Sequence, residues 1–275
     1  MTRILDTHLH LVYPDRFAYP WLEGAGGLNR AWSIERFRKE ALSLGIDRAL
    51  HMEVDVAEPD MEAETRFVLG LDPMVVGAIA AARPEHETFA AHIERLAALP
   101  GLRGVRRILH QSEDGLSQTP LFAENLRRLA GHGLSFDLCV LARQHGVGEK
   151  LMRQCPDVQF VLDHCGGPDV VGRDYTIWRE SVARIAELPN VACKVSGIIA
   201  YAGPNWVLAD LKPYFEAVID LFGWDRVVWG SDFPVCTQHA SLTDWVKATH
   251  ALLDGCSAEE KAKLLHKNAE RVYRV

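Results

Sequence analysis

Short apolar runs alternate with amphipathic stretches along the whole chain. Runs such as Phe160-Val161-Leu162 and Val227-Val228-Trp229 are apolar on both faces, which is typical of strands buried inside a parallel sheet. Such runs predict strands over residues 4–11, 48–54, 74–80, 102–108, 134–141, 159–164, 191–196 and 226–231. Apolar positions with helical spacing fill the gaps. They predict helices over residues 33–44, 59–70, 87–98, 120–132, 144–155, 178–187, 208–222 and 242–253.

A last helix is predicted over residues 257–273, and it opens with the capping-box sequence Ser257-Ala258-Glu259-Glu260. Eight strands, each followed by a helix, predict a (β/α)8 barrel of the TIM type with an extra C-terminal helix. No linker, charge block or low-complexity segment divides the chain, so we expect one domain over residues 1–275. The alternative, an open doubly wound sheet, has fewer strands and a Gly-x-Gly-x-x-Gly turn that is missing after the first strand.

Composition narrows the class of protein. A hydrophobic content of 48% and a charged content of 24% indicate a globular protein with an ample core. The formal net charge of −7, without a basic run, disfavours a nucleic-acid partner. No apolar stretch approaches the ~20 residues of a membrane span, and the first residues do not resemble a signal peptide. The six cysteines show neither Cys-x-x-Cys pairs nor framework spacing, so we expect a reduced, cytoplasmic protein.

The first candidate for chemistry is His8-Leu9-His10, at the end of the first predicted strand. Side chains two residues apart on a strand point to the same face, so the two imidazoles should converge. Such a pair can hold a divalent metal when neutral or bind an anionic oxygen when protonated. The spacing alone is weak evidence, and its value depends on other ligands from distant strands.

The active site of such a barrel lies at the C-terminal ends of its strands. The other strand ends offer Glu53, Arg106, His164, Lys194 and Asp232. Asp232 ends a very apolar strand and precedes Phe-Pro. An acid in such surroundings requires a partner, which favours a functional role. The alternative is that Asp232 caps a turn. His164 could be a core histidine and Lys194 could form a structural salt bridge, while Glu53 could be a metal ligand or the partner of one. The histidines at 86, 92, 110, 132, 145, 239, 250 and 266 are expected at the surface.

These residues and the motifs around them resemble the amidohydrolase superfamily. The resemblance covers nearly the whole chain. Within the superfamily, the chain looks like the amidohydrolase-2 branch, which contains L-fuconolactonase, L-rhamnono-lactonase and 2-pyrone-4,6-dicarboxylate hydrolase. The motifs that carry the resemblance are Asp6-Thr7-His8-Leu9-His10, Tyr19-Pro20-Trp21-Leu22, Gly104-Val105-Arg106, Phe160-Val161-Leu162-Asp163-His164, Leu188-Pro189-Asn190-Val191-Ala192-Cys193-Lys194-Val195-Ser196-Gly197 and Trp229-Gly230-Ser231-Asp232-Phe233-Pro234-Val235-Cys236.

The chain departs from the binuclear members of the superfamily. Those members have a bridging lysine on strand 4 and histidines on strands 5 and 6, whereas here strand 4 offers Arg106 and strand 5 reads Phe136-Asp137-Leu138-Cys139. A binuclear centre is therefore not expected. The resemblance leaves two alternatives open: a metal-independent site, or one divalent ion such as zinc. The ligands of that ion would come from His8, His10, His164 and Asp232, with Glu53 as a further candidate.

The resemblance implies that the protein hydrolyses a lactone, a sugar aldonolactone in the first instance, by direct attack of water. A serine acyl-enzyme is disfavoured because no Gly-x-Ser-x-Gly elbow is present. Asp232 is expected to act as general base and then as proton donor, His164 and the His8–His10 pair to polarise the carbonyl, and Arg106 to bind substrate oxygens. Lys194 and Trp21 are further candidates for substrate binding.

Three alternatives remain. The first is hydrolysis of an anionic pyrone or dicarboxylate lactone, for which Arg83 and Arg143 could assist Arg106. The second is a metal-dependent decarboxylase of the same superfamily, and the third is a catalytically silent binding protein on a barrel scaffold. The expected partner is a small-molecule lactone. The oligomeric state is open, and a homodimer is among the alternatives.

Overall fold

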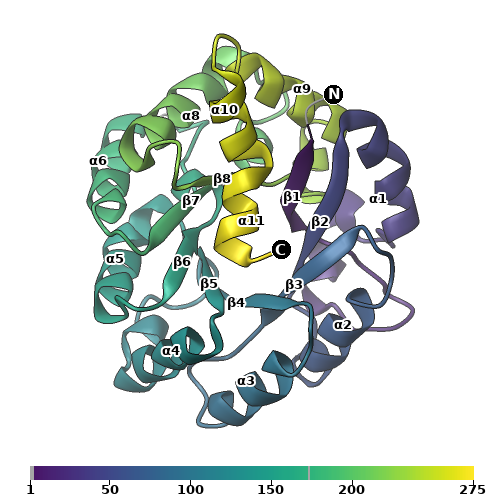
Figure 1. Cartoon of the computed structure of the whole chain (residues 1–275), viewed down its shortest axis with the longest axis vertical. Coiled ribbons are helices and arrows are strands. Elements are labelled where there is room, and N and C mark those ends of the chain that lie inside the picture. The colour runs from purple at the N-terminus through teal and green to yellow at the C-terminus, as the bar shows by residue number, and fades with distance from the viewer. Residues whose placement is uncertain (1–2, 173) are drawn as a thin grey trace.

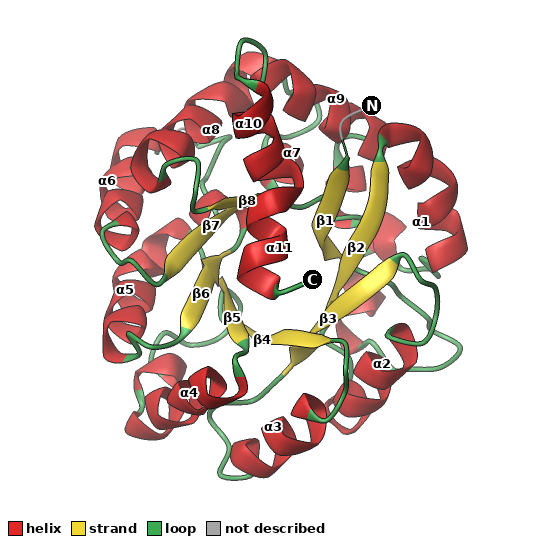
Figure 2. Cartoon of the chain, in the orientation of Figure 1, coloured by secondary structure: helices red, strands yellow, loops and turns green. Residues whose placement is uncertain are grey.

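The computed structural model describes residues 3–172 and 174–275, and it confirms the predicted barrel. Eight parallel strands follow one another in sequence order around a nearly closed barrel, with helices on the outside (Figures 1 and 2). The strands are β1 (Ile4–Leu9), β2 (Ile46–Met52), β3 (Val75–Ala81), β4 (Leu102–Ile108), β5 (Ser135–Cys139), β6 (Gln159–Leu162), β7 (Val191–Val195) and β8 (Val227–Trp229).

The barrel closes between its first and last strands. The Thr7 hydroxyl donates a hydrogen bond to the Trp229 carbonyl at 2.8 Å, and the His10 N–H donates to the Phe233 carbonyl at 2.8 Å. Parallel pairing from β1–β2 through β7–β8 completes the ring. The C-terminal ends of all eight strands therefore meet at one mouth of the barrel.

The helices surround the sheet at nearly the predicted positions. They are α1 (Ile34–Ala41), α2 (Met61–Val68), α3 (Phe89–Ala97), α4 (Pro120–His132), α5 (His145–Gln154), α6 (Tyr175–Ala186), α7 (Ile198–Tyr201), α8 (Leu208–Phe222) and α9 (Leu242–Leu252). The short helix α7 was not predicted, and it follows β7 directly. Among the described residues, no helix has the length and apolar character needed to cross a bilayer.

The C-terminal segment forms α10 (Ala258–Ala262), a π-helical turn (Lys263–Lys267) and α11 (Asn268–Tyr273), where the sequence predicted one uninterrupted helix. The predicted capping box is present, because the Ser257 hydroxyl accepts from the Glu260 N–H and the Glu260 carboxylate accepts from the Ser257 N–H. In Figure 1 this segment crosses one end of the barrel. Glu270 pairs with Arg48 near the start of β2, which places α11 at the N-terminal mouth, opposite the C-terminal ends of the strands.

The barrel interior is apolar near this helix and polar above it. Apolar side chains of the strands pack against α11 in one buried cluster, which contains Leu5, Leu50, Met52, Ile79, Val161, Ala192, Val228, Ala269, Val272 and Tyr273. Higher in the barrel, a layer of fully buried polar side chains includes Asp6, His8, Asp137 and Lys194. Buried charges of this kind need partners. Their arrangement forms the floor of the candidate active site.

Candidate active site

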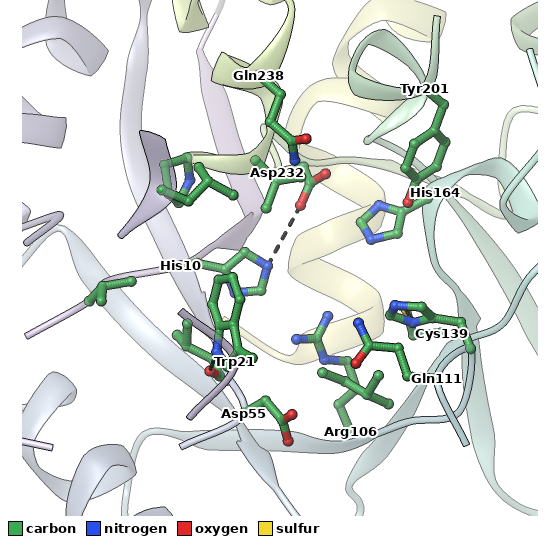
Figure 3. Close-up of a pocket in the computed structure, with 17 residues that line it drawn as sticks. His10, Trp21, Asp55, Arg106, Gln111, Cys139, His164, Tyr201, Asp232 and Gln238 are labelled. Carbon is green, nitrogen blue, oxygen red and sulfur yellow. Dashed lines mark hydrogen bonds and ion pairs between the residues drawn. The ribbon is translucent and has the colours of Figure 1, made fainter. Parts of the chain in front are cut away.

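A cavity of ≈ 280 Å³ opens at the C-terminal mouth of the barrel, where the sequence predicted the site (Figure 3). Its residues come from strand ends and the loops that follow them. They are His10, Val12, Trp21, Leu28, Val54, Asp55, Arg106, Ile108, His110, Gln111, Cys139, His164, Tyr201, Asp232, Pro234, Val235 and Gln238. The mixture of an apolar wall and a few polar groups is typical of a small-molecule site.

Three of these residues hold the backbone in the left-handed region, which is unfavourable for side-chain-bearing residues. The φ angles are 48° for Asp55, 54° for His164 and 55° for Asp232. Each follows a strand, so the left-handed turn directs the side chain into the mouth of the barrel. Backbone strain of this kind concentrates at functional sites, where the surrounding structure enforces it.

His8, His10 and Asp232 converge at the bottom of the cavity. The Nε2 atoms of His8 and His10 lie 3.7 and 3.6 Å from Oδ1 of Asp232 (Figure 3 shows the second contact). The Nδ1 of His10 lies 3.0 Å from the Met52 carbonyl oxygen, which can only accept, so Nδ1 carries the proton. The lone pair on Nε2 of His10 therefore faces the Asp232 carboxylate, and a proton or a cation between them would satisfy both.

Burial controls the protonation of these groups. Burial and the neighbouring Arg106 lower the pKa of His10 to about 3, so His10 is neutral near pH 7. The pKa of His8 is also far below its ordinary value, because of burial first and the Lys194 ammonium second. Burial raises the pKa of Asp232 to about 6, although His164 and Arg106 oppose this shift. A carboxyl group with this pKa can gain and lose a proton near neutral pH.

Arg106 is oriented by Glu53. Its Nε donates to Oε1 of Glu53 at 2.6 Å, and its NH2 donates to the Glu53 carbonyl oxygen at 2.7 Å. The remaining nitrogen, NH1, lies 3.3 Å from Nε2 of His8. Burial opposes ionisation of Glu53, but Arg106 and the Asp55 N–H together outweigh burial and lower the pKa of the carboxyl group. The other oxygen of Glu53 accepts from the Asp55 N–H at 2.7 Å, so the structure places Glu53 as the partner of Arg106.

Lys194 lies beneath the cavity and is completely buried. Its ammonium contacts Oδ2 of Asp137 at 2.6 Å, Oδ1 of Asp163 at 2.9 Å and Nδ1 of His8 at 3.2 Å. Tyr273, from α11, donates to the same Asp137 oxygen at 2.7 Å. The structure therefore places Lys194 below the cavity floor, where the two carboxylates fix its position.

The remaining candidates lie around the cavity. The Nδ1 of His164 lies 2.9 Å from the Ser196 hydroxyl, and the His164 ring lines the cavity. Gly197 has a φ of 69°, and a Cβ at this position would lie 2.6 Å from Nδ1 of His164, so only glycine permits the close approach. Trp21 lies in the 3-10 helix Pro20–Gly24 and also faces the cavity.

Histidine and carboxylate side chains at the cavity floor offer ligands for a divalent cation. Two groups of ligand atoms lie within 4.8 Å of one another: His8, His10 and Asp232, and His8, Asp163 and His164. In the first group the two histidine-to-Asp232 distances, 3.6 and 3.7 Å, are close to the separation of about 3.4 Å between tetrahedral ligands at ~2.1 Å from zinc. The buried Oδ2 of Asp232 has no hydrogen-bond partner among the described residues. The spacing of these ligand atoms therefore fits one cation, although Arg106 NH1 already lies 3.3 Å from Nε2 of His8.

The second group already has a cation, because the Lys194 ammonium lies 2.9 Å from Oδ1 of Asp163. Two metal ions would also have to share His8. The expectation that the centre is not binuclear stays a prediction.

Sequence reasoning missed several residues of the site. Asp163 was quoted in a motif but was not a candidate, although it ends an apolar run in the same way as Asp232. Asp55, Gln111, Tyr201 and Gln238 come from loops or short helices after the strands, and no pattern identifies which loop residues face the cavity.

The expectation of a surface position was wrong for His145, which is buried, whereas His110 is half-buried. His110 lines the cavity, with its Nδ1 3.2 Å from the Cys139 sulfur. His145 is 1% exposed, and its ring contacts the Ser181 hydroxyl and the Gly166 carbonyl oxygen at 2.7 and 2.6 Å. Both positions lie in segments that read as loop or helix ends, and only the tertiary packing buries His145 and brings His110 to the cavity.

Comparisons with known proteins found similar sequences and a similar solved structure. An uncharacterized protein of Sinorhizobium fredii is 29% identical over 99% of this chain and 98% of its own length. An L-fucono-1,5-lactonase of Burkholderia ambifaria is 31% identical over 67% of this chain and 66% of its own length. A crystal structure of an amidohydrolase from Burkholderia multivorans with bound zinc superposes with a TM-score of 0.89, at 26% identity and 99% coverage of both chains. The family model described as amidohydrolase matches residues 5–275, and the chain therefore belongs to the amidohydrolase family.

Proposed function

We propose that this protein hydrolyses the internal ester of a lactone, specifically a sugar aldonolactone, to the open-chain hydroxy acid. The observation that carries the proposal is the Asp232 carboxyl group, which is buried at the cavity floor with a pKa of about 6 and faces two neutral imidazoles. The lactonase name of a relative supports the same class of reaction.

Asp232 acts first as a general base. Its carboxylate takes a proton from a water molecule as the water oxygen forms a bond to the lactone carbonyl carbon. The protonated Asp232 then gives this proton to the ring oxygen as the bond between the carbonyl carbon and that oxygen breaks. The proton is returned, so Asp232 is regenerated and one water has been added to the ester.

The developing oxyanion needs donors that are fixed in advance. Glu53 holds Nε and NH2 of Arg106, and we assign the third nitrogen, NH1, which lies 3.3 Å from Nε2 of His8, to the carbonyl oxygen of the substrate. We assign His164, whose ring lines the cavity, to the same carbonyl oxygen. Lys194 supports the site from below by holding Asp163 and His8 in place.

A divalent cation such as zinc would be held by His8, His10 and Asp232, with His164 beside them. When bound, it would polarise the carbonyl group and lower the pKa of a nearby water. The zinc in the Burkholderia multivorans amidohydrolase supports this assignment. We propose one ion, because the Lys194 ammonium fills the second group of ligands.

A neutral substrate fits the site better than a dicarboxylate lactone. Arg106, the arginine that lines the cavity, is already neutralised by Glu53 at 2.6 Å. The two other arginines considered for an anionic substrate have partners as well: Arg83 contacts Asp55 at 3.4 Å, and the exposed Arg143 contacts Asp114 at 3.2 Å. No described arginine of this set is left free to bind a substrate carboxylate.

The test is a pH-indicator screen of aldonolactones, run with and without a chelator. Hydrolysis releases acid, so turnover lowers the pH and is read directly. We expect turnover of at least one aldonolactone; a panel that yields none overturns the proposed function. Loss of turnover with chelator and its recovery with zinc would support the metal site, whereas full activity after chelation would show that the side chains suffice.

A further inference from the structure

Asp55 places a second carboxyl group in the cavity wall, away from the reacting centre. It follows β2 in a left-handed conformation, and its N–H donates to Glu53 at 2.7 Å, which ties its backbone to the residue that holds Arg106. Figure 3 shows Asp55 at the lower edge of the labelled residues, with His10 and Trp21 between it and Asp232. Asp55 therefore lies where the part of a substrate remote from the ester would lie.

The Asp55 carboxylate has room for a ligand. Its side chain is 32% exposed, and its recorded side-chain contact is from Arg83 NH2 to Oδ1 at 3.4 Å. Among the residues that the structure describes, none donates a hydrogen bond to the other oxygen, Oδ2. Arg83 also lies 3.9 Å from Glu58, so its single charge is shared between two acids. Asp55, Glu58 and Arg83 together therefore carry one net negative charge.

The surroundings of Asp55 suit a polyhydroxylated ring. Trp21 donates from its indole Nε1 to the Val54 carbonyl oxygen at 2.7 Å, which fixes an aromatic ring beside Asp55. Gln111 adds an amide group with donors and acceptors to the same cavity, and Gln238 adds another on the Asp232 side (Figure 3). An aromatic face can cover the C–H surface of a sugar, while a carboxylate accepts hydrogen bonds from its hydroxyls.

We propose that Asp55 is a specificity-determining residue that selects neutral, hydroxyl-bearing lactones and rejects lactones that carry a carboxylate. Its carboxylate accepts hydrogen bonds from the hydroxyls at the end of the substrate remote from the ester. A substrate carboxylate at that end would instead face a like charge, and the described arginines that line or flank this wall are already paired with acids. This inference rests on the proposed function.

The experiment compares two substrates that differ at one position. One is the aldonolactone that turns over fastest in the screen, and the other is the aldarolactone of the same ring, in which the terminal CH2OH is a carboxylate. The ratio of their kcat/KM values is measured for the wild type, Asp55→Asn and Glu58→Gln at about pH 8, well above the ordinary carboxyl pKa values. Glu58→Gln is the matched control, because it removes a negative charge beside Arg83 but lies outside the cavity.

We expect Asp55→Asn to shift the ratio at least tenfold toward the aldarolactone, and Glu58→Gln to leave it within about twofold of the wild type. An unchanged ratio in Asp55→Asn, or equal shifts in both variants, overturns the role of Asp55 while the lactonase activity stands. A wild type that hydrolyses no aldonolactone overturns the proposed function and this inference with it. The two failures are therefore distinguishable.

Discussion

Glu53 holds Arg106 through two hydrogen bonds, from Nε to Oε1 at 2.6 Å and from NH2 to the Glu53 carbonyl oxygen at 2.7 Å. The guanidinium group is planar, and Glu53 holds its Nε and NH2. The remaining nitrogen, NH1, can therefore point in only one direction, which is toward His8. The neighbouring Arg107 makes the corresponding contact outside the barrel, with its Nε 2.8 Å from Glu85. The two adjacent arginines thus have opposite environments, as alternation along a strand predicts.

Glu53→Gln should lower kcat/KM for the aldonolactone by about 10- to 100-fold, the equivalent of ~1.5–3 kcal/mol for a hydrogen bond between charged groups. The side chain keeps its shape, but Arg106 loses the charge that orients it. Steady-state kinetics measure the effect. Glu85→Gln is the control, because it removes the same contact from Arg107, and we expect it to change kcat/KM less than about threefold.

Asp232→Asn should lower kcat by ~10²- to 10⁴-fold, because the amide cannot accept the proton of the attacking water. Circular dichroism and thermal unfolding establish that the variant is folded. A folded Asp232→Asn variant with wild-type turnover would show that another group is the base.

The activity should fall as the pH falls through about 6. Burial raises the pKa of Asp232 to about 6, and only the deprotonated form can act as a base, so kcat/KM is full above this pH and is lost below it. A pH–rate profile checks the midpoint. Addition of zinc should move the acid limb to lower pH, because a cation stabilises the carboxylate. An acid limb near the ordinary Asp value of 3.8, in protein stripped of metal, would contradict the assignment.

Lys194→Met should destabilise the protein by ~3–5 kcal/mol, because Asp137 and Asp163 would remain buried without their cation. Tyr273→Phe removes only one hydrogen bond to Asp137 and should cost ~1–2 kcal/mol. Urea denaturation measures both. The control Lys212→Met removes an exposed contact to Glu216 and should stay within ~0.5 kcal/mol of the wild type. If Lys194→Met is no less stable than the control, the buried network does not support the barrel.

The sequence by itself determined the barrel and the principal residues of its mouth. Continuous apolar strands such as 160–162 and 227–229 can be buried only with both faces covered, and eight of them alternating with helices leave few other folds. The polar residues that interrupt these runs, including His8, Asp232 and Arg106, lie at strand ends, so their convergence follows from the parallel topology alone. The helix cap at Ser257 also depends on local sequence alone, because its partner Glu260 is three residues away.

Only the tertiary structure decided how these groups are paired. Lys194 read as a candidate for substrate binding, but its strand carries it beneath the cavity between Asp137 and Asp163, from two other strands. Asp55 and His110 reach the cavity from loops, whose paths carry no periodic signal. The energies of buried charges depend on neighbours from distant parts of the chain, so the roles of these residues cannot be read from local sequence.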